Sequence, residues 1–483
     1  MVFTLFSIAA VAAFPGAQGG GALSKGGRGG RVYLIANLND SGPGSLRACV
    51  AASGPRTCVF RTGGTIALLS TLRADNPFLT IAGQTAPGGG VQLTGPKSPG
   101  DPALMITTHD VVVQYLRVRR GHYQGEICNA KPWSCGASIE IFSNSASTDP
   151  HEIMIDHVSA EWSNYDAMIA LGSNAAPRQP RSLTVSHSIV GEALAGAGQT
   201  VGVNFGGYSG AGPGAPDGMT DLDFHHDLFA GTSHRMPLLT VKSARLVNNL
   251  VYAWTYYPMR GKGLRDFIGN VFKTRTGQTA ASHEIQAWTE DARNDTSLSP
   301  SFYVSGNIGP SDPNGSDNWA MTALARNESA GEASSPLPAK YRRSAPMPAP
   351  AIPITAEPAA TLPSALLGDV GASRKLDCNG RWVDALDPVD RRIVKAVADG
   401  TNLHGSYDYS SLRGSPQSQA DLGGWPTLAA GTPCADAGGN GLPDAWESHW
   451  ARVFGHRIEP SGVDFADGYT NLEHYIDGMS PSP

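Results

Sequence analysis

The sequence is short of charge and of long apolar runs, and each shortage excludes a class of protein. Only 16% of its 483 residues are Asp, Glu, Lys or Arg, and the formal net charge is −6. A chain with so few basic residues offers no generally cationic surface for nucleic acid. Beyond the first residues, no stretch is long and apolar enough to cross a bilayer. We therefore expect neither a nucleic acid nor a membrane as partner.

Glycine is abundant instead, and it shapes the expected fold. The chain contains 58 Gly, and its apolar residues, 41% of the total, stand in short runs. Frequent glycines between short apolar segments favour many turns and short strands over long helices. The chain is also long enough to bury a large core. We therefore expect an all-β protein.

The N-terminus lacks basic residues but carries a short apolar run. Residues 2–13 end in Ala-Val-Ala-Ala, which is typical of the apolar core and cleavage site of a secretory signal, although no Lys or Arg precedes Lys25. A buried first strand, or a start codon placed too late, would explain the same run. We predict that residues 1–12 are a signal peptide and that the protein is secreted.

Cysteines support an oxidising location. The six fall into two close pairs and one distant pair: Cys49 with Cys58, Cys128 with Cys135, and Cys378 with Cys434. The short loops favour disulfides in the first two pairs, and neither has the Cys-x-x-Cys spacing of a zinc site. Three disulfides fit an extracellular protein.

A repeated pattern runs through the middle of the chain, where short β-rich segments carry a polar pair between apolar residues. The pairs begin at Asp156, Ser186, His225, Asn248, Gly269 and Gly306. The shortest step is 21 residues, and this spacing indicates a solenoid in which each coil adds one strand to each of several parallel sheets. We predict a structural ladder along the coils, formed by Asn248, Asn249, Asn270 and Asn307.

One segment has no acidic residue. Between Leu228 and Arg265 the chain contains no Asp or Glu but six basic residues: Arg235, Lys242, Arg245, Arg260, Lys262 and Arg265. In a chain of net negative charge this is a local cationic face, and we expect it to bind an anionic partner. A solvated edge with its counter-charges elsewhere in the fold would explain the same run.

Motifs around this segment resemble a known family. From His225 the chain reads His-His-Asp-x-Phe, then five residues and Arg-x-Pro from Arg235, followed by Asn-Asn-x-Val-Tyr from Asn248. Glycine-rich motifs precede them at 13–21, 26–33, 38–47 and 80–90. Together these motifs resemble the bacterial branch of the pectate lyases of polysaccharide lyase family one. The resemblance and the repeat jointly imply a right-handed parallel β-helix over residues 13–333.

The resemblance also implies a reaction. Members of the family cleave pectate-type uronans by β-elimination to 4,5-unsaturated products, and the Arg of Arg-x-Pro, here Arg235, is the base. Elimination needs a base for the C5 proton and positive charge beside the carboxylate that C5 carries. Arginine can be a base only where the site lowers its pKa, which ordinarily lies above about 12. The expected protein is a monomeric enzyme whose partner is an anionic polysaccharide.

Other residues of this region are predicted to bind the substrate: His226, His234, Lys242, Arg260 and Lys262. A histidine titrates near neutral pH, so His234 would also be able to carry a proton beside Arg235. We expect His225 to be structural. The Asp156-His157 pair suits an interior hydrogen bond at least as well as a ligand site.

Pectate lyases bridge enzyme and uronate with calcium, and the sequence departs from their pattern. Where the family places acidic ligands, the chain reads 134–138 and 163–170, in which only Asp166 remains, and the family's second Arg is replaced by Thr240. Three interpretations stay open. The protein is a calcium-dependent pectate lyase with an altered site, a lyase that uses its own cations on a different or methylated uronan, or a carbohydrate-binding β-helix without activity.

A glycoside hydrolase on the same fold is the alternative enzyme. It needs a cluster of carboxylates, and Asp221, Asp223 and Asp227 are close in sequence. Alternation along a strand puts Asp221, Asp223 and His225 on one face and His226 on the other, where we expect it on the wall of the site. No other motif supports hydrolysis, so we favour elimination at Arg235.

The composition changes after residue 333. A proline-rich run over 334–363 cannot continue a parallel sheet and predicts an extended wrap. Asp387, with Pro behind it, predicts the start of an amphipathic helix that packs on the solenoid. We assign 334–430 to this wrap and helix, and 431–483 to a C-terminal segment.

The C-terminal segment contains a loop that resembles an EF-hand. Oxygen side chains stand at loop positions 1, 5, 9 and 12, with Gly441 at position 6: Asp436, Asn440, Asp444 and Glu447. Position 3 is Gly438, so one ligand is missing. We predict a structural calcium ion here, remote from Arg235. A turn that caps the helix around Trp446 is the alternative.

Overall fold

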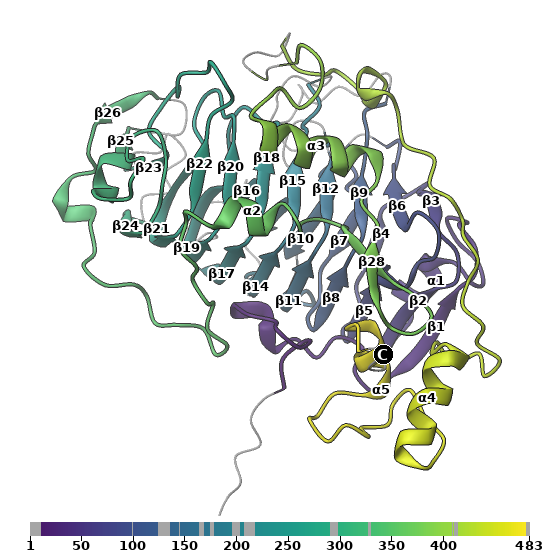
Figure 1. Ribbon diagram of the computed structural model, residues 1–483. Coiled ribbons are helices and arrows are strands. Elements are labelled where there is room, and N and C mark those ends of the chain that lie inside the picture. Colours follow the sequence, from purple (N-terminus) through teal and green to yellow (C-terminus); the bar gives the residue numbers. More distant parts are fainter. Residues whose placement is uncertain are drawn as a thin grey trace, which may run out of the picture.

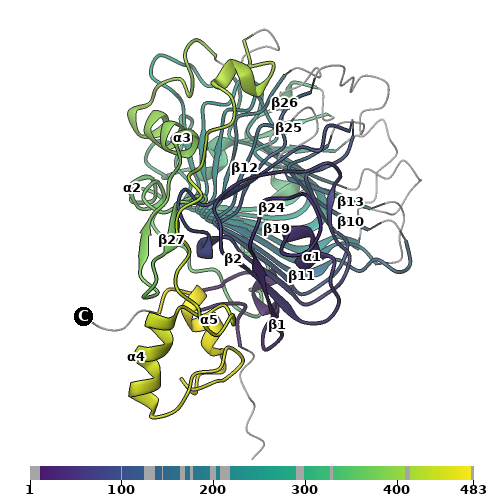
Figure 2. The same ribbon diagram turned by 90° about the vertical axis from the view of Figure 1, so that its right-hand side faces the viewer.

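A computed structural model describes the protein at residues 11–98, 100–123, 136–143, 145–163, 169–173, 178–195, 203–206, 218–289, 298–326, 330–407, 409 and 414–479. In this part of the chain, short parallel strands stack coil on coil in three sheets (Figure 1). Along the coil axis the sheets enclose a tube, and helix α1 (Leu46–Val50) lies across its N-terminal end (Figure 2). The fold is a right-handed parallel β-helix, so the predicted fold is confirmed.

Successive coils add strands to each sheet in turn. The first sheet contains β1 (Arg31–Ile35), β2 (Arg56–Phe60), β5 (Leu79–Ala82), β8 (Val111–Gln114), β11 (His151–Asp156), β14 (Arg181–Ser186), β17 (Thr220–His225) and β24 (Ser301–Ser305). The second contains β3 (Gly64–Ala67), β6 (Val91–Thr94), β9 (Arg117–Arg119), β12 (Ser159–Glu161), β15 (Ile189–Gly191), β18 (Leu228–Ala230), β20 (Leu250–Tyr252) and β22 (Val271–Lys273).

The third sheet bears on function. It contains β4 (Leu72–Ala74), β7 (Leu104–Ile106), β10 (Ile139–Ser143), β13 (Ile169–Ser173), β16 (Val203–Gly206), β23 (Ile285–Trp288) and β25 (Thr322–Ala325), with β26 (Glu332–Ser334) antiparallel at its end. Two long strands, β19 (Leu238–Val247) and β21 (Met259–Ile268), run through the corner between sheets. Their first halves pair within the third sheet and their second halves within the first.

Identical positions of successive coils fill the inside of the tube. The register of the first sheet aligns Val113, Ile155, Val185, Phe224 and Leu246, and all five are fully buried. Full burial of such a side chain stabilises the fold by about 1.5–3 kcal/mol. A shift of one residue would turn the whole column outwards, so the pattern of apolar residues fixes the register.

An asparagine ladder marks the corner between the first and second sheets. The side-chain oxygen of Asn249 accepts a bond from the backbone N–H of Asp227, that of Asn270 from Asn249, and that of Asn307 from Asn270, at 2.9–3.0 Å. The predicted stacking of Asn249, Asn270 and Asn307 is confirmed. Asn248 has another role: at a φ of 52°, it exchanges two hydrogen bonds with the backbone of Glu357 and anchors the wrap.

Aromatic rings form a second column at the same corner. Tyr115, His157, His187 and His226 occupy equivalent left-handed turn positions, with φ of 51°, 51°, 47° and 56°, and their ring centroids stack 4.6, 4.8 and 5.0 Å apart. Asp156 accepts a 2.8 Å hydrogen bond from His157. Burial alone would lower the pKa of His157, but the charge of Asp156 outweighs it, and the pKa is raised to about 9.

This column predicts a pH dependence of stability. The folded state holds a proton on His157 more tightly than the unfolded chain, whose histidines titrate near 6.5. The resulting stabilisation is complete below about pH 6.5, and we expect about 3 kcal/mol to be lost as the pH rises to about 9. Urea unfolding at several pH values measures this slope, and His157→Gln should flatten it. The exposed His456→Gln is the control. Equal slopes in all three proteins would contradict the assignment.

The wrap lies over the second sheet and ends at the N-terminal end of the tube. Helices α2 (Leu362–Leu366) and α3 (Pro388–Asp399) cover the sheet, followed along the chain by α4 (Asp444–Phe454) and α5 (Asn471–Ile476) (Figures 1 and 2). A hairpin of β27 (Arg374–Leu376) and β28 (Trp382–Asp384) precedes α3. Asp387 caps α3 by accepting the backbone N–H groups of Val389 and Asp390, so the predicted packing helix is confirmed.

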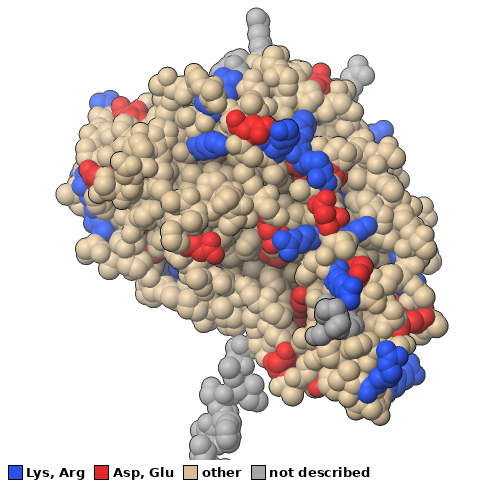
Figure 3. All heavy atoms as spheres, viewed as in Figure 1, with Lys and Arg blue, Asp and Glu red and all other residues tan. Residues whose placement is uncertain are grey.

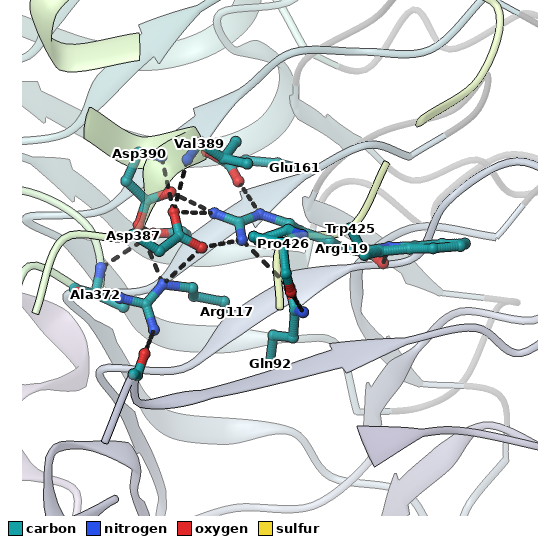
Figure 4. Close-up of polar contacts among 12 residues, drawn as sticks. Gln92, Arg117, Arg119, Glu161, Ala372, Asp387, Val389, Asp390, Trp425 and Pro426 are labelled. Carbon is teal, nitrogen blue, oxygen red and sulfur yellow. Dashed lines mark hydrogen bonds and ion pairs between the residues drawn. The ribbon is translucent and has the colours of Figure 1, made fainter. Parts of the chain in front are cut away.

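Beneath α3 the wrap is attached by a buried ionic network (Figure 4). Arg119, on β9, contacts Glu161 at 2.5 Å, Asp390 at 2.5 Å and Asp387 more closely still. Arg117 lies 3.4 Å from both aspartates. All five side chains are almost completely buried. On the outer surface of this face, acidic and basic side chains intermix and neither sign dominates (Figure 3).

Two of the predicted disulfides are present: Cys49 with Cys58, and Cys378 with Cys434. Cys128 and Cys135 lie outside the described residues. At the N-terminus, Ala12 accepts a hydrogen bond from Arg28, and Ala13 is buried and donates its backbone N–H to Ala22, so both residues pack on the body. Within the described part of the chain, every helix is too short or too polar to traverse a bilayer.

Candidate functional site

The loop between β18 and β19 holds Arg235 in an unusual conformation. Its φ is 62°, and the Met236-Pro237 peptide that follows is cis. Two backbone bonds fix the loop on the next coil, from Met236 N–H to Pro258 at 2.9 Å and from Arg260 N–H to Pro237 at 3.1 Å. A left-handed residue other than glycine costs on the order of 1 kcal/mol or more, and the same conformation recurs at the corner positions of the coils described above. Arg235 is only 9% exposed.

His234 stands between two arginines. Its Nδ1 lies 2.6 Å from Ser233 Oγ, and its ring packs edge-on against Tyr257 with centroids 5.0 Å apart. Burial lowers the pKa of His234 well below its usual range, and the charges of Arg235 and Arg260 lower it further. His234 is therefore neutral at ordinary pH. The predicted role as a proton carrier near neutral pH is corrected, because the site disfavours the protonated form.

Two more cations come from β21 in the next coil. Arg260 and Lys262 are separated by one residue and therefore share a face of the strand, and the register sets them beside Leu238 and Thr240 of β19. The guanidinium carbon of Arg260 lies 3.7 Å from the centroid of Tyr257. Lys262 Nζ lies 5.7 Å from the ring of Trp288. Both cations are buried, which strengthens their pull on any anion that reaches them.

Only some of the six basic residues between Leu228 and Arg265 lie near Arg235. Lys242 is exposed in the irregular part of β19, where it bends between sheets, and no described contact joins it to Arg235. Arg245 bonds Asp221 at 2.7 Å and Asp223 at 2.9 Å. The guanidinium of Arg265 points into the bend and donates to the backbone carbonyls of Leu239 and Val241.

His226 lies at a different corner of the coil from the Arg235 loop. It was expected on the wall of the site, but it belongs to the histidine column between the first and second sheets, stacked on His187. The φ of His226 is 56°, so the residue lies in a left-handed turn. The alternation of side chains along a strand, from which the direction of its side chain was predicted, therefore does not apply to it. Burial and the charge of His187 lower the pKa of His226 to about 4. The expectation is therefore corrected: the β18 strand separates His226 from the Arg235 loop.

The carboxylates of the hydrolase alternative are used structurally. Asp223 is fully buried, accepts the backbone N–H of Gly20 at 2.6 Å and pairs with Arg245. Burial raises its pKa to about 6, despite Arg245. Asp227 is also buried and accepts the backbone N–H of Ser188 at 2.8 Å, while burial raises its pKa well above the usual range. These groups do not form a catalytic pair at one open site.

Aromatic residues of the site were missed by the sequence analysis. Tyr256 and Tyr257 lie against His234, Trp288 against Lys262, and Gln286 hydrogen-bonds Arg260. The sequence did contain a signal for the tyrosines. Tyr256 and Tyr257 follow the end of β20 at the same distance as His234 and Arg235 follow the end of β18. Trp288 and Gln286 gave no signal, because their strand carries no motif.

The predicted calcium ligands fall in two places. Asp166 lies outside the described residues. In the C-terminal loop, Asp436 accepts the backbone N–H of Gly441 at 3.0 Å, and Asn440 donates to Glu447 at 2.7 Å. Burial raises the pKa of Glu447, and the charges of Asp436 and Asp444 raise it further, whereas the hydrogen bond from Asn440 lowers it. The loop therefore concentrates negative charge.

Across the described chain, the one group of three closely spaced metal-ligating side chains is Asp156, His157 and His187. Asp156 already accepts hydrogen bonds from His157 and from Ser186. The two imidazole rings are parallel to within 4°. Each lone pair lies in its own ring plane, and rings stacked face to face 4.8 Å apart do not direct their lone pairs at one point, so we interpret the group as part of the structural column.

Fold and site together define a right-handed parallel β-helix with a buried cationic and aromatic site on one of its sheets. No model of a known protein family matches the chain. It is similar to the probable pectate lyase C of Aspergillus fumigatus, with 28% identity over 487 residues, 99% of this chain and 96% of the relative. Probable pectate lyase C of Emericella nidulans is 27% identical over 478 residues, 98% of this chain and 94% of the relative.

Solved structures with a similar course include the major allergen from cedar pollen, at 15% identity and a TM-score of 0.48, covering 74% of this chain and 92% of that one. A thermostable pectate lyase gives 14% identity and a TM-score of 0.49, covering 74% and 96%. The curated relatives are fungal, whereas the glycine-rich motifs resemble the bacterial branch. Assignment to that branch stays a prediction.

Proposed function

We propose that the protein is a pectate lyase, which cleaves polygalacturonate and related pectic uronans by β-elimination. The observation that carries this proposal is the convergence of Arg235 and Arg260 on His234, with Lys262 two residues after Arg260 on the same face of β21. The curated relatives, similar over nearly the whole chain, bear the name pectate lyase.

Arg235 is the base of the proposed reaction. It takes the C5 proton of a uronosyl residue, the electron pair of the C–H bond forms the C4–C5 double bond, and the C4–O bond breaks. The leaving oxygen takes up a proton from water, and Arg235 returns its own proton to solvent. The reaction requires the neutral guanidine, because a protonated guanidinium has no lone pair with which to accept the C5 proton.

Arg260 and Lys262 have the second task. Electron density builds up beside the substrate carboxylate as the C5 proton leaves, and fixed positive charge in a buried site stabilises it. Each of the two cations also lies against an aromatic ring, whose face attracts a cation but carries no net charge. The site can thus neutralise the carboxylate with its own groups.

Calcium does not fit the described part of this site. Calcium takes several oxygen ligands, preferably carboxylates, whereas the described side chains around Arg235 are cationic, aromatic or amide. Asp166 is the carboxylate that the sequence offers. We keep calcium at the active site as a proposal that depends on Asp166, and no step of the reaction is routed through it.

The C-terminal loop fits calcium better. Its oxygen side chains stand at EF-hand spacing around a glycine with φ of 89°, and its carboxylates repel one another. We propose a structural calcium ion held by Asp436, Asn440, Asp444 and Glu447. We also propose that residues 1–12 are removed as a signal peptide and that a secreted monomer results.

Removal of calcium should therefore lower thermal stability without directly touching the Arg235 site. We expect a chelator to lower the melting temperature of the wild-type protein by several degrees, because a bound ion stabilises the folded state by mass action. Asp436→Asn should have a lower melting temperature that chelator no longer changes. A melting temperature that is insensitive to chelator in both proteins would contradict the loop site.

Lys262 allows a test of the cations. We expect Lys262→Met to lower kcat/KM on polygalacturonate by about tenfold to a hundredfold, because one buried cation that stabilises the developing charge is lost. Lys395→Met, on the exposed side of α3, is the matched control and should match the wild type. Steady-state kinetics measure this difference. Equal kcat/KM values for the two variants would show that Lys262 does not act at the site.

The function itself is tested on a panel of uronans of differing methylation, each with and without chelator, and on a neutral glucan. A lyase produces the ultraviolet absorbance of an unsaturated uronide on one or more uronans and none on the glucan. New reducing ends without this absorbance would identify a hydrolase. Binding without any new ends would identify a carbohydrate-binding protein.

A further inference from the structure

The loop after β20 places an exposed aromatic ring beside the proposed base. Tyr256 is 39% exposed, whereas its neighbour Tyr257 is fully buried. The backbone N–H of Tyr256 donates to the carbonyl of Ser233 at 2.9 Å, so the loop lies directly against that of Arg235. Its ring centroid lies 5.6 Å from that of His234.

Packing alone does not explain this position. Among the large hydrophobic side chains that the structure describes as exposed, Tyr256 is the one aromatic ring. It rests on Tyr257 with centroids 5.0 Å apart, and the guanidinium carbon of Arg260 lies 5.6 Å from its centroid. The ring is thus supported from below, open to solvent and adjacent to a buried cation.

We propose that Tyr256 is the platform on which the uronosyl ring next to the cleaved bond rests. A pyranose ring presents C–H groups on its faces and polar groups around its edge, and an aromatic ring offers a flat apolar surface with a negative face. Arg260, beside the same ring, reaches the carboxylate at the sugar's edge. The ring recognises a pyranose and the cation recognises its acid group, so the pair selects uronic acids over neutral sugars.

This inference rests on the proposed function, because it identifies the substrate as a uronan bound at Arg235. It assigns Tyr256 to binding and not to proton transfer. Loss of its ring should therefore weaken the substrate complex and leave the chemical step nearly unchanged. Loss of the hydroxyl alone should have little effect, since the ring face makes the contact.

Three variants test the assignment: Tyr256→Ala, Tyr256→Phe and, as a matched control, Leu264→Ala. Leu264 is 38% exposed, but it lies on the second half of β21, in the first sheet. On polygalacturonate we expect Tyr256→Ala to raise KM about tenfold with kcat within about twofold, and Tyr256→Phe and Leu264→Ala to resemble the wild type. A fall in kcat at unchanged KM would overturn the proposal.

A binding measurement separates this proposal from the function on which it rests. Calorimetry with trigalacturonate, in an Arg235→Lys background that prevents turnover, should give a dissociation constant about tenfold higher for Tyr256→Ala than for Leu264→Ala. Equal constants would overturn the platform, whether or not the enzyme is a lyase. If the wild type forms no unsaturated product while the tenfold difference remains, elimination is wrong and the platform stands.

Discussion

Arg235→Lys should abolish at least about 99% of the elimination rate, equivalent to about 2.7 kcal/mol or more in the activation barrier. Lysine has a basic nitrogen at a similar reach, but it lacks the planar guanidinium whose nitrogen takes the C5 proton. Substrate affinity should change little, because Arg260 and Lys262 remain. Initial rates from unsaturated-uronide absorbance, with trigalacturonate binding measured alongside, give both quantities.

The matched control is Arg391→Lys, the same exchange at an exposed position of α3, which should leave the rate unchanged. Melting temperatures of both variants should equal that of the wild type. Equal turnover in Arg235→Lys and the wild type would mean that the base lies elsewhere. A lowered melting temperature of Arg235→Lys alone would show instead that its left-handed loop depends on the guanidinium.

Arg119→Met should reduce the free energy of unfolding by about 3–5 kcal/mol, because the truncation of one partner leaves buried carboxylates without their cation. Arg119 contacts Glu161, Asp387 and Asp390, and each of these side chains is almost fully buried. Arg117 would then be the remaining cation of the network, and its described ion pairs are with Asp387 and Asp390. Urea unfolding monitored by tryptophan fluorescence measures the loss.

Arg391→Met provides the comparison for this second result. Arg391 pairs with Asp384 at 3.0 Å, but both side chains are more than half exposed, and such pairs contribute at most about 1 kcal/mol. Activity at a temperature where Arg119→Met is folded should match the wild type, since the network lies under α3 on the second sheet. A loss below about 1 kcal/mol would show that the network is not a principal attachment of the wrap.

Features that repeat or that act locally could be predicted from the sequence. The polar pairs recur at the same point of each coil, so they indicated the solenoid and the stacking of Asn249, Asn270 and Asn307. Asp387 followed by Pro carries its own capping geometry, and α3 begins there. Cys49 and Cys58 are close enough in the chain that folding leaves them few other partners.

Features that depend on the path of the chain between coils could not be predicted. Alternation along a strand predicted the direction of His226, but β17 ends at His225 and a left-handed turn follows. The cationic segment suggested six equivalent charges, whereas the bend between sheets directs Arg245 to Asp223 and turns Arg265 inwards. Trp288 meets Lys262 only because their strands are neighbours in the third sheet.

The central claim, that Arg235 initiates an elimination, is tested most directly by the masses of the products from a purified galacturonate oligomer. Elimination adds no water, so each cleavage should yield one fragment that is lighter by one water than the saturated oligomer of the same length, and Arg235→Lys should yield almost none. If every fragment has the mass of a saturated oligomer, water has been added across the cleaved bond, and the account is contradicted.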